Sequence, residues 1–239
     1  MILIRSLAAA VLLLLAGAAA RADQPVDLEL VMAVDASGSI TTGALEFQLR
    51  GHAAAFRSAE VAESLTVGGT RSVAVTLVQW AGPNTLEIVV PWARVADAAD
   101  AKAFAERIGA MTRPPLDGST AMGSAIDRAA DLFDGNGFEG VRRVIDISGD
   151  GVNNRGRPPS LARDEAVAAG ITINGLPILN DRPNPWGGPA PIDLDRYYEE
   201  NVIGGPGAFY IAARDFDDFA AAILSKLIRE IAGLGSGAG

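Results

Sequence analysis

The sequence predicts an α/β protein with a doubly wound, mostly parallel sheet of six strands, one antiparallel edge strand and helices on both faces. Two observations lead to this fold class. Apolar runs of strand length alternate along the chain with segments whose apolar residues recur every three or four positions, as they do in helices. One link, residues 81–84, is too short for a crossover helix, so the strands on either side of it should form an antiparallel hairpin at the sheet edge.

The individual elements follow from these patterns. Strands are expected at residues 28–34, 72–80, 86–90, 142–148, 171–176 and 208–212. Helices are expected at about residues 43–56, 97–111, 120–133, 160–169, 194–202 and 215–232. In open sheets of this kind, ligands bind beyond the carboxyl ends of the strands, where the strand order reverses. Asp35 and Asp150 each follow the carboxyl end of a predicted strand, so they mark the edge at which a site is expected.

The chain is predicted to have three parts. Residues 1–22 have the features of a secretory signal peptide, with an apolar run up to Ala20 and a small-x-small cleavage site between Ala22 and Asp23. An uncleaved anchor is the alternative, although the apolar run is short for a membrane span of about 20 residues. Residues 23–232 should form one domain, and the glycine-rich residues 233–239 should be disordered. We therefore expect a periplasmic or secreted protein whose mature chain has no membrane span.

The composition narrows the classes of partner. Without Arg5 and Arg21, which lie in the predicted signal peptide, 18 basic residues stand against 29 acidic ones, which gives a formal charge of −11. This excess of negative charge argues against nucleic acid or an anionic membrane surface as a partner. The chain has no cysteine, so disulfide bonds do not contribute to its stability.

The first candidate site follows the first predicted strand. Asp35, Ser37 and Ser39 place a carboxylate and two hydroxyls at alternate positions, and Gly38 lets the backbone bend so that the three side chains can converge. Oxygen ligands of this kind suit a hard divalent cation such as Mg²⁺. The same residue types also turn the chain and cap helices, so the stretch on its own fits either role.

Two later segments carry oxygen ligands in similar positions, one opening a predicted helix at Gly118 and one following a predicted strand at Asp150. Together with the first, they resemble the three loops of the metal-ion-dependent adhesion site of von Willebrand factor type A domains. The matching motifs are Asp-x-Ser-x-Ser from Asp35, Gly-Ser-Thr-x-x-Gly-x-Ala-Ile from Gly118, and Asp-Gly from Asp150. The resemblance covers residues 26–232, in strand order as well as in motif.

This resemblance implies a Rossmann-like fold and a set of metal ligands. The implied ligands are the hydroxyls of Ser37, Ser39 and Thr120, with Asp35 and Asp150 binding the ion directly or through water. The ion would be Mg²⁺, with Mn²⁺ or Ca²⁺ as alternatives. Two carboxylates roughly neutralise a divalent ion and leave a coordination position open, which an acidic side chain of a protein partner could fill. The implied function is therefore metal-dependent protein binding without a catalytic step.

A closer resemblance is to a bacterial secreted subgroup described as a domain of unknown function. It is carried by residues 148–154, residues 180–184, the pair Tyr197-Tyr198 and residues 202–209. This subgroup implies no known ligand. In the Pro-rich loop at residues 181–192, Trp186 could anchor a partner beside the metal, or it could pack against the domain as part of a rigid surface loop.

Enzyme classes find little support in the sequence. His52 is the only histidine, and it is expected in the first helix, on a surface or partly buried face, with no motif that links it to a nucleophile. The chain lacks a His-Glu-x-x-His motif and a phosphate-binding loop. Metal-assisted hydrolysis of phosphate or sulfate esters at Asp35 is the alternative function, but such enzymes need a second acidic residue where this chain has Ser37. A structural domain with an unused metal site is the third alternative.

Overall fold

The computed structural model describes residues 23–110, 116, 118–179, 193–215 and 218–233. Its centre is a sheet in the order β3-β2-β1-β4-β5. The strands are β1 (Gln24–Asp35), β2 (Val73–Trp80), β3 (Leu86–Val95), β4 (Phe138–Gly149) and β5 (Ile171–Pro177). β1 pairs in parallel with β2 and β4, β4 pairs in parallel with β5, and β3 is antiparallel to β2. The predicted fold class and the antiparallel edge strand are thereby confirmed.

The predicted sixth strand at residues 208–212 is not a regular strand. Within the part of the chain that the structure describes, the sheet has five strands. This segment pairs with β5 through one isolated parallel bridge, Gly175 to Tyr210, and a second bridge joins Ile178 to Ala213, just beyond both segments. Two local features interrupt the ladder. Pro177 has no N–H to donate, and the N–H of Phe209 donates to the side chain of Asn174 at 3.1 Å instead of to a strand carbonyl.

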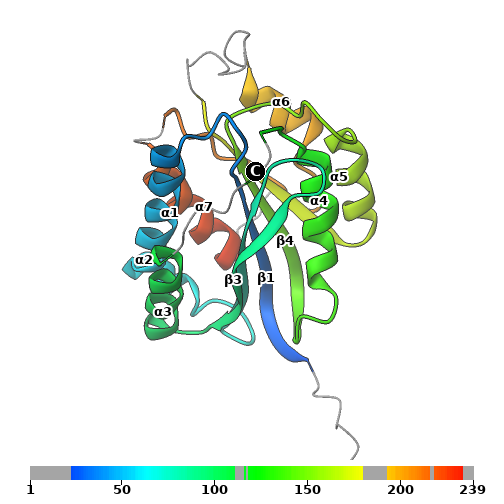
Figure 1. The fold of residues 1–239 in the computed structure, drawn as a ribbon. Helices are drawn as coiled ribbons and strands as arrows, with labels where there is room; N and C mark the ends of the chain where they lie inside the picture. The colour runs from blue at the N-terminus through cyan, green and yellow to red at the C-terminus, as the bar shows by residue number, and fades with distance from the viewer. Residues whose placement is uncertain (1–22, 111–115, 117, 180–192, 216–217, 234–239) are drawn as a thin grey trace, which may run out of the picture.

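Helices cover both faces of the sheet (Figure 1). One face is covered by α1 (Thr42–Phe56), α2 (Ala59–Ser64), α3 (Ala98–Gly109) and α7 (Phe219–Ala232). The other is covered by α4 (Met122–Ala130), α5 (Pro159–Ala168) and α6 (Leu194–Asn201), with a short 3-10 helix, η1 (Asp131–Phe133), after α4. Side chains of β1 alternate between the two layers, as the pleat requires: Leu30 and Met32 pack on the α7 side, and Val31 and Ala33 on the α4 side.

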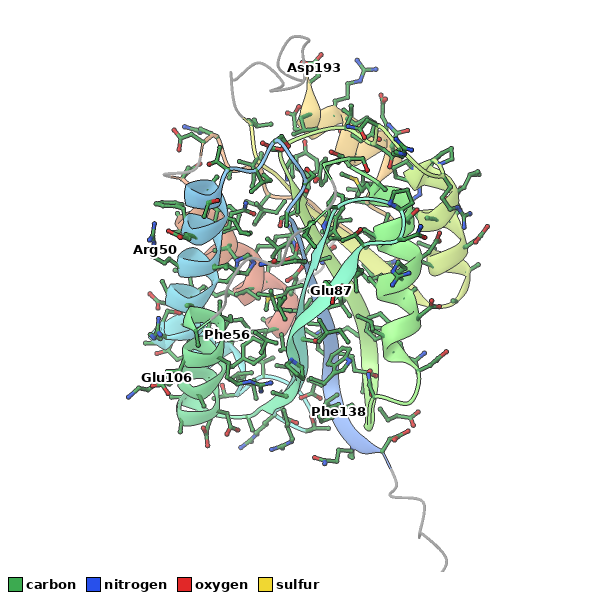
Figure 2. The ribbon with its side chains drawn as sticks, in the orientation of Figure 1. Arg50, Phe56, Glu87, Glu106, Phe138 and Asp193 are labelled. Carbon is green, nitrogen blue, oxygen red and sulfur yellow. The ribbon has the colours of Figure 1, made fainter. Side chains whose placement is uncertain are left out.

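The helices begin close to where their apolar periodicity predicts, and polar caps fix some of the starts. The N–H of Ala44 donates to Thr41 Oγ1 at 3.2 Å at the start of α1, and Asp97 caps α3 in the same way. The helix expected at 120–133 ends as an α-helix at Ala130, and α2 was not predicted at all. Phe56 of α1 packs on Phe104 of α3, with ring centroids 4.9 Å apart, which joins these helices (Figure 2).

Several predictions fall outside the described residues. They concern the signal peptide at 1–22, the Pro-rich loop with Trp186, and the tail beyond Gly233. Among the residues that are described, no helix has both the length and the apolar character that a membrane span requires. The loops that follow β1 and β4 lie at the same end of the molecule, the upper end in Figure 1.

Candidate metal centre

The loop after β1 begins with a buried turn. Parallel pairing places Asp35 opposite Trp80 of β2, and the N–H of Ala36 donates to the carbonyl of Trp80 at 2.8 Å. Asp35 Oδ1 then accepts a hydrogen bond from the N–H of Ser37 at 2.7 Å. Asp35 and Ser37 are both completely buried. Oδ1 of Asp35 therefore stabilises a turn, which is one of the two roles that the sequence left open for this residue.

The loops after β1 and β4 meet through their side chains. Ser39 Oγ donates to Asp150 Oδ1 at 2.6 Å across 111 residues of sequence, and Ser37 Oγ lies 3.3 Å from Ser39 Oγ. The cause is the register of the sheet, since Val34 of β1 lies opposite Ser148 of β4. Segments that leave the carboxyl ends of neighbouring parallel strands start side by side. Two of the three predicted loops are thus in direct contact.

The third loop is held to the other two by its backbone. The N–H of Gly38 donates to the carbonyl of Gly118 at 3.1 Å. Thr120 exchanges two hydrogen bonds with Asn154: its N–H donates to Asn154 Oδ1 at 2.9 Å, and its carbonyl accepts from the N–H of Asn154 at 2.9 Å. The structure therefore brings the three segments that carry Asp35, Ser37, Ser39, Thr120 and Asp150 to one end of the sheet.

Sequence reasoning missed Tyr198 of α6, which packs beneath this edge. It is fully buried, and its hydroxyl donates weakly to the carbonyl of Gly149 at 3.5 Å. A Cβ on Gly149 would lie 3.0 Å from Asp35 Oδ2 and 3.1 Å from the Tyr198 hydroxyl oxygen, so a larger residue here would have to displace these side chains slightly. Burial, and then the negative charges of Asp35 and Asp150, raise the pKa of Tyr198 well above its usual value. The sequence analysis used the Tyr197-Tyr198 pair only as part of the resemblance to a bacterial subgroup and predicted no position for it near the site.

Oxygen donors of this kind fit a hard divalent cation. Hydroxyls and carboxylates are the ligands that Mg²⁺ and Ca²⁺ take, and no sulfur or imidazole is among the five predicted ligands. Among the described residues, no group of three or more His, Cys, Asp or Glu side chains could hold a metal, so the hydroxyls would have to take part. Asp35 and Ser37 are fully buried, whereas Ser39 is partly exposed and Asp150 is 7% exposed. The oxygen cluster therefore opens to solvent on the side of Ser39 and Asp150.

His52 does not belong to this edge. It is 1% exposed, whereas the sequence placed it on a surface or partly buried face. Its Nδ1 lies 2.9 Å from the carbonyl oxygen of Gln48, and its ring centroid is 5.4 Å from that of Phe219 in α7. Burial lowers its pKa below 6.5. The side chain is packed between α1 and α7, which makes it part of the core.

The chain has the fold of von Willebrand factor type A domains. It has the same fold as proximal thread matrix protein 1 from the mussel byssus, with a TM-score of 0.63 and 16% identity over 88% of this chain and 49% of that one. The chain shares this fold with BatB from Bacteroides thetaiotaomicron, with a TM-score of 0.54 and 20% identity over 86% of this chain and 99% of that one. It also shares it with the von Willebrand factor type A structure from Catenulispora acidiphila, with a TM-score of 0.55 and 16% identity over 88% of this chain and 43% of that one. The chain spans about half the length of the mussel protein.

The chain belongs to the family described as "Protein of unknown function (DUF1194)", whose model matches residues 25–235. Both resemblances, to the von Willebrand type A fold and to a bacterial subgroup of unknown function, are confirmed. None of the curated proteins compared with the chain matches it. Another structure of the mussel protein has its metal-ion-dependent adhesion motif occupied by zinc.

Proposed function

We propose that the protein is a secreted or periplasmic metal-dependent protein-binding domain. The observation that carries the proposal is the 2.6 Å contact between Ser39 and Asp150, which joins two loops that are 111 residues apart in the sequence. A third loop is tied to these two through Gly38 and Asn154. The zinc-occupied motif of the mussel protein supports the choice of a divalent ion, because that protein has the same fold.

Five side chains would hold the ion: Asp35, Ser37, Ser39, Thr120 and Asp150. We propose Mg²⁺ as the resident ion, with Mn²⁺ or Ca²⁺ as alternatives, because each of these ions prefers oxygen ligands. When bound, the ion supplies a positive charge at the open side of the site. The whole chain has a formal charge of −9, so a partner's carboxylate would otherwise meet repulsion. Asp35 and Asp150 set the charge of the site, and the hydroxyls complete the shell.

Binding without catalysis is the simpler function for this edge. No described histidine lies there, and Ser37 stands two positions after Asp35, where a metal-assisted phosphatase would carry its second acid. We therefore propose a protein carboxylate, and no ester, as the group that completes the metal shell.

Calorimetric titration of Mg²⁺ into the purified protein tests the metal. We expect a saturable heat for the wild type and for the Glu106→Gln variant, and none for Asp150→Asn. Glu106 is an exposed carboxylate on α3, at the other end of the molecule (Figure 2), so its variant is a control matched in chemistry. Equal heats from the wild type and from Asp150→Asn would remove the metal from the proposal.

Capture of a partner tests the function. Immobilised protein should retain a partner from a periplasmic or secreted extract in Mg²⁺ and release it in chelator, and Glu106→Gln should behave in the same way. Asp150→Asn should retain nothing in either buffer. Retention that is the same with chelator and with Mg²⁺ would favour a structural domain whose site is unused.

A further inference from the structure

A second group of polar side chains lies deep under α7, away from the candidate metal centre. It consists of Asp146 of β4, Asn174 of β5, and Lys226 and Glu230 of α7, which we call the α7 cluster. All four are at most 3% exposed, and Lys226 is completely buried. Buried lysine and glutamate side chains are rare in proteins unless they are paired, so these contacts require an explanation.

The contacts of the α7 cluster are short. Lys226 Nζ donates to Glu230 Oε1 at 2.5 Å, and Asn174 Nδ2 donates to the same oxygen at 2.9 Å. Lys226 Nζ also lies 2.7 Å from Asp146 Oδ1. Lys226 Nζ therefore lies between the carboxyl groups of Glu230 and Asp146. Glu230 Oε1 also joins α7 to β5 through its hydrogen bond with Asn174.

The approach of Lys226 to Asp146 differs from an ordinary ion pair. Although the two atoms are 2.7 Å apart, the contact lacks hydrogen-bond geometry, and among the described residues both Asp146 carboxylate oxygens are buried without a hydrogen-bond partner. Nζ is thus close to the carboxyl group without making the hydrogen bond that a buried carboxylate needs. Because Oδ1 is bonded to Cγ, the nitrogen also lies near the carbon with which an amine can form an amide.

The surroundings favour neutral groups. Two carboxylates and one ammonium lie in the core, and the ring centroid of Phe209 is 5.4 Å from Nζ. Charged side chains without water are costly, and such groups tend to exchange protons and become neutral. Burial raises the pKa of Glu230 to about 7, although the charge of Lys226 opposes the shift. The Glu230 carboxyl group, which contacts Lys226 Nζ, can therefore both accept and release a proton near neutral pH.

We propose that Lys226 and Asp146 join in an intramolecular amide bond, with Glu230 transferring the protons. One proton first passes from Lys226 Nζ to the Asp146 carboxylate, the amine then attacks Cγ of the carboxyl group, and an Nζ–Cγ bond forms. Glu230 accepts a proton from the nitrogen and donates one to the departing hydroxyl group. The Cγ–O bond breaks and one water molecule leaves, so no group is oxidised or reduced.

This bond would link α7 covalently to β4, four residues before Asp150. The chain has no cysteine, so a disulfide bond cannot make such a link. The inference stands independently of the metal, since none of the residues in the α7 cluster is a proposed ligand.

Mass spectrometry of the purified, denatured protein tests the bond. The wild type should be lighter than its sequence mass by one water molecule. A tryptic digest should contain a branched peptide in which residues 144–155 are joined to residues 215–229, because trypsin does not cleave after an acylated lysine. Separate peptides that end at Lys226 and contain unmodified Asp146, together with the full sequence mass, would overturn the proposal. A branch to Asn174, with loss of one ammonia molecule, would overturn it equally.

Three variants assign the roles, and the mass of the denatured chain reports on each. Lys226→Arg should have its full sequence mass, and Glu230→Gln should lose most of the branched peptide. Asp146→Asn should lose ammonia in place of water, so that the product has the same branched peptide as the wild type. Circular dichroism shows whether each variant folds. Should the variants fail to fold, the wild-type digest alone decides between an amide and an ion pair.

Discussion

The protein gathers polar side chains in two places that differ in almost every physical respect. The candidate metal centre lies in loops at the carboxyl end of the sheet, contains oxygen donors only, and opens to solvent beside Ser39. The α7 cluster lies in regular elements, is closed, and contains its own amino group in Lys226, within 2.7 Å of Asp146 Oδ1. The first can offset its negative charge with an ion from solution, whereas the second must offset or remove its charge within the chain, by an ion pair or by the proposed amide. The comparison shows two ways in which one sheet can hold carboxylates: close to solvent, where an ion can neutralise them, and in the core, where only another side chain can.

The largest expected effect is the loss of the Lys226 amino group. Lys226→Met removes the nitrogen that contacts the carboxyl groups of both Asp146 and Glu230, and with it the proposed amide, so the free energy of unfolding should fall by about 3–5 kcal/mol. Urea unfolding measures it. The matched control is Arg196→Met, which breaks an exposed pair with Glu200, 2.7 Å long, and should cost less than about 1 kcal/mol. Similar losses for the two variants would show that the α7 cluster is no more sensitive than the surface.

The pH dependence should come from the α7 cluster. Because the pKa of Glu230 is raised from 4.5 to about 7 in the folded state, the folded protein binds the proton more tightly than the unfolded chain does. The free energy of unfolding should therefore fall as pH rises from about 4.5 to about 7, by on the order of 3 kcal/mol. Urea unfolding of the wild type and of Glu230→Gln across this range measures the effect, and only the wild type should show the fall.

Other charged groups act on the same measurement. Lys226 and Asp146 influence the pKa of Glu230, and Arg142 lies beside it. Arg142 and His52 are present in both proteins, and the lowered pKa of His52 has the opposite sign, since its contribution is lost as pH falls below 6.5. The proposed amide between Lys226 and Asp146 is mostly absent from Glu230→Gln, so the offset between the two curves reports on the amide and only the slope of their difference with pH reports on Glu230. A difference that rises with pH would contradict the raised pKa of Glu230.

The contrast between the two regions also explains what the sequence could predict. Asp35, Ser39 and Asp150 were predictable because they follow neighbouring parallel strands, and such strands end at the same edge. The α7 cluster was not predictable. Lys226 and Glu230 flank the buried apolar stripe of Phe219, Ile223 and Leu227 in the helix that was predicted at 215–232, and a helical pattern alone assigns flanking charges to the solvent side. They are buried because α7 lies over Asp146 and Asn174, a long-range placement that no local pattern contains.

The prediction of a sixth strand at residues 208–212 was wrong for a similar reason. The apolar run at residues 208–212 has strand character, and it does lie beside β5. Whether it joins the sheet depends on its neighbour, where Pro177 lacks a donor and Asn174 binds the N–H of Phe209. Pro177 was visible in the sequence. The side-chain bond from Asn174 was not, because it depends on the same placement of β5 that forms the α7 cluster.

Metal should act on one region and not on the other. At a Mg²⁺ concentration 100 times the Kd, the wild type should gain about 2.7 kcal/mol in its free energy of unfolding. Glu230→Gln should gain the same amount, and Asp150→Asn should gain nothing. Urea unfolding with Mg²⁺ and with chelator measures the three gains. A loss of the gain in Glu230→Gln would show that the two regions are coupled energetically, and the comparison would then need revision.

The smallest expected effect concerns Tyr198, a buried group beneath the metal centre that belongs to neither set of charges. Burial and then the charge of Asp35 raise its pKa, and its hydroxyl donates to the carbonyl of Gly149, the residue before Asp150. Outer groups that hold a ligand loop contribute about tenfold in metal affinity. Tyr198→Phe should therefore weaken Mg²⁺ binding about tenfold, or about 1.4 kcal/mol. Its unfolding in chelator should change by no more than about 1 kcal/mol, because the lost hydrogen bond is 3.5 Å long.

The neighbouring tyrosine provides the matched control. Tyr197 is half-buried, and its hydroxyl accepts from the N–H of Asn153 at 3.2 Å, farther along the loop than Asp150. Tyr197→Phe should leave the Mg²⁺ affinity within about twofold of the wild type, since it removes the same group without touching Asp35 or Gly149. Calorimetry on the two variants separates the positions. An equal loss in both would mean that α6 supports the loop as a whole, and Tyr198 would have no particular part in placing the carboxylates.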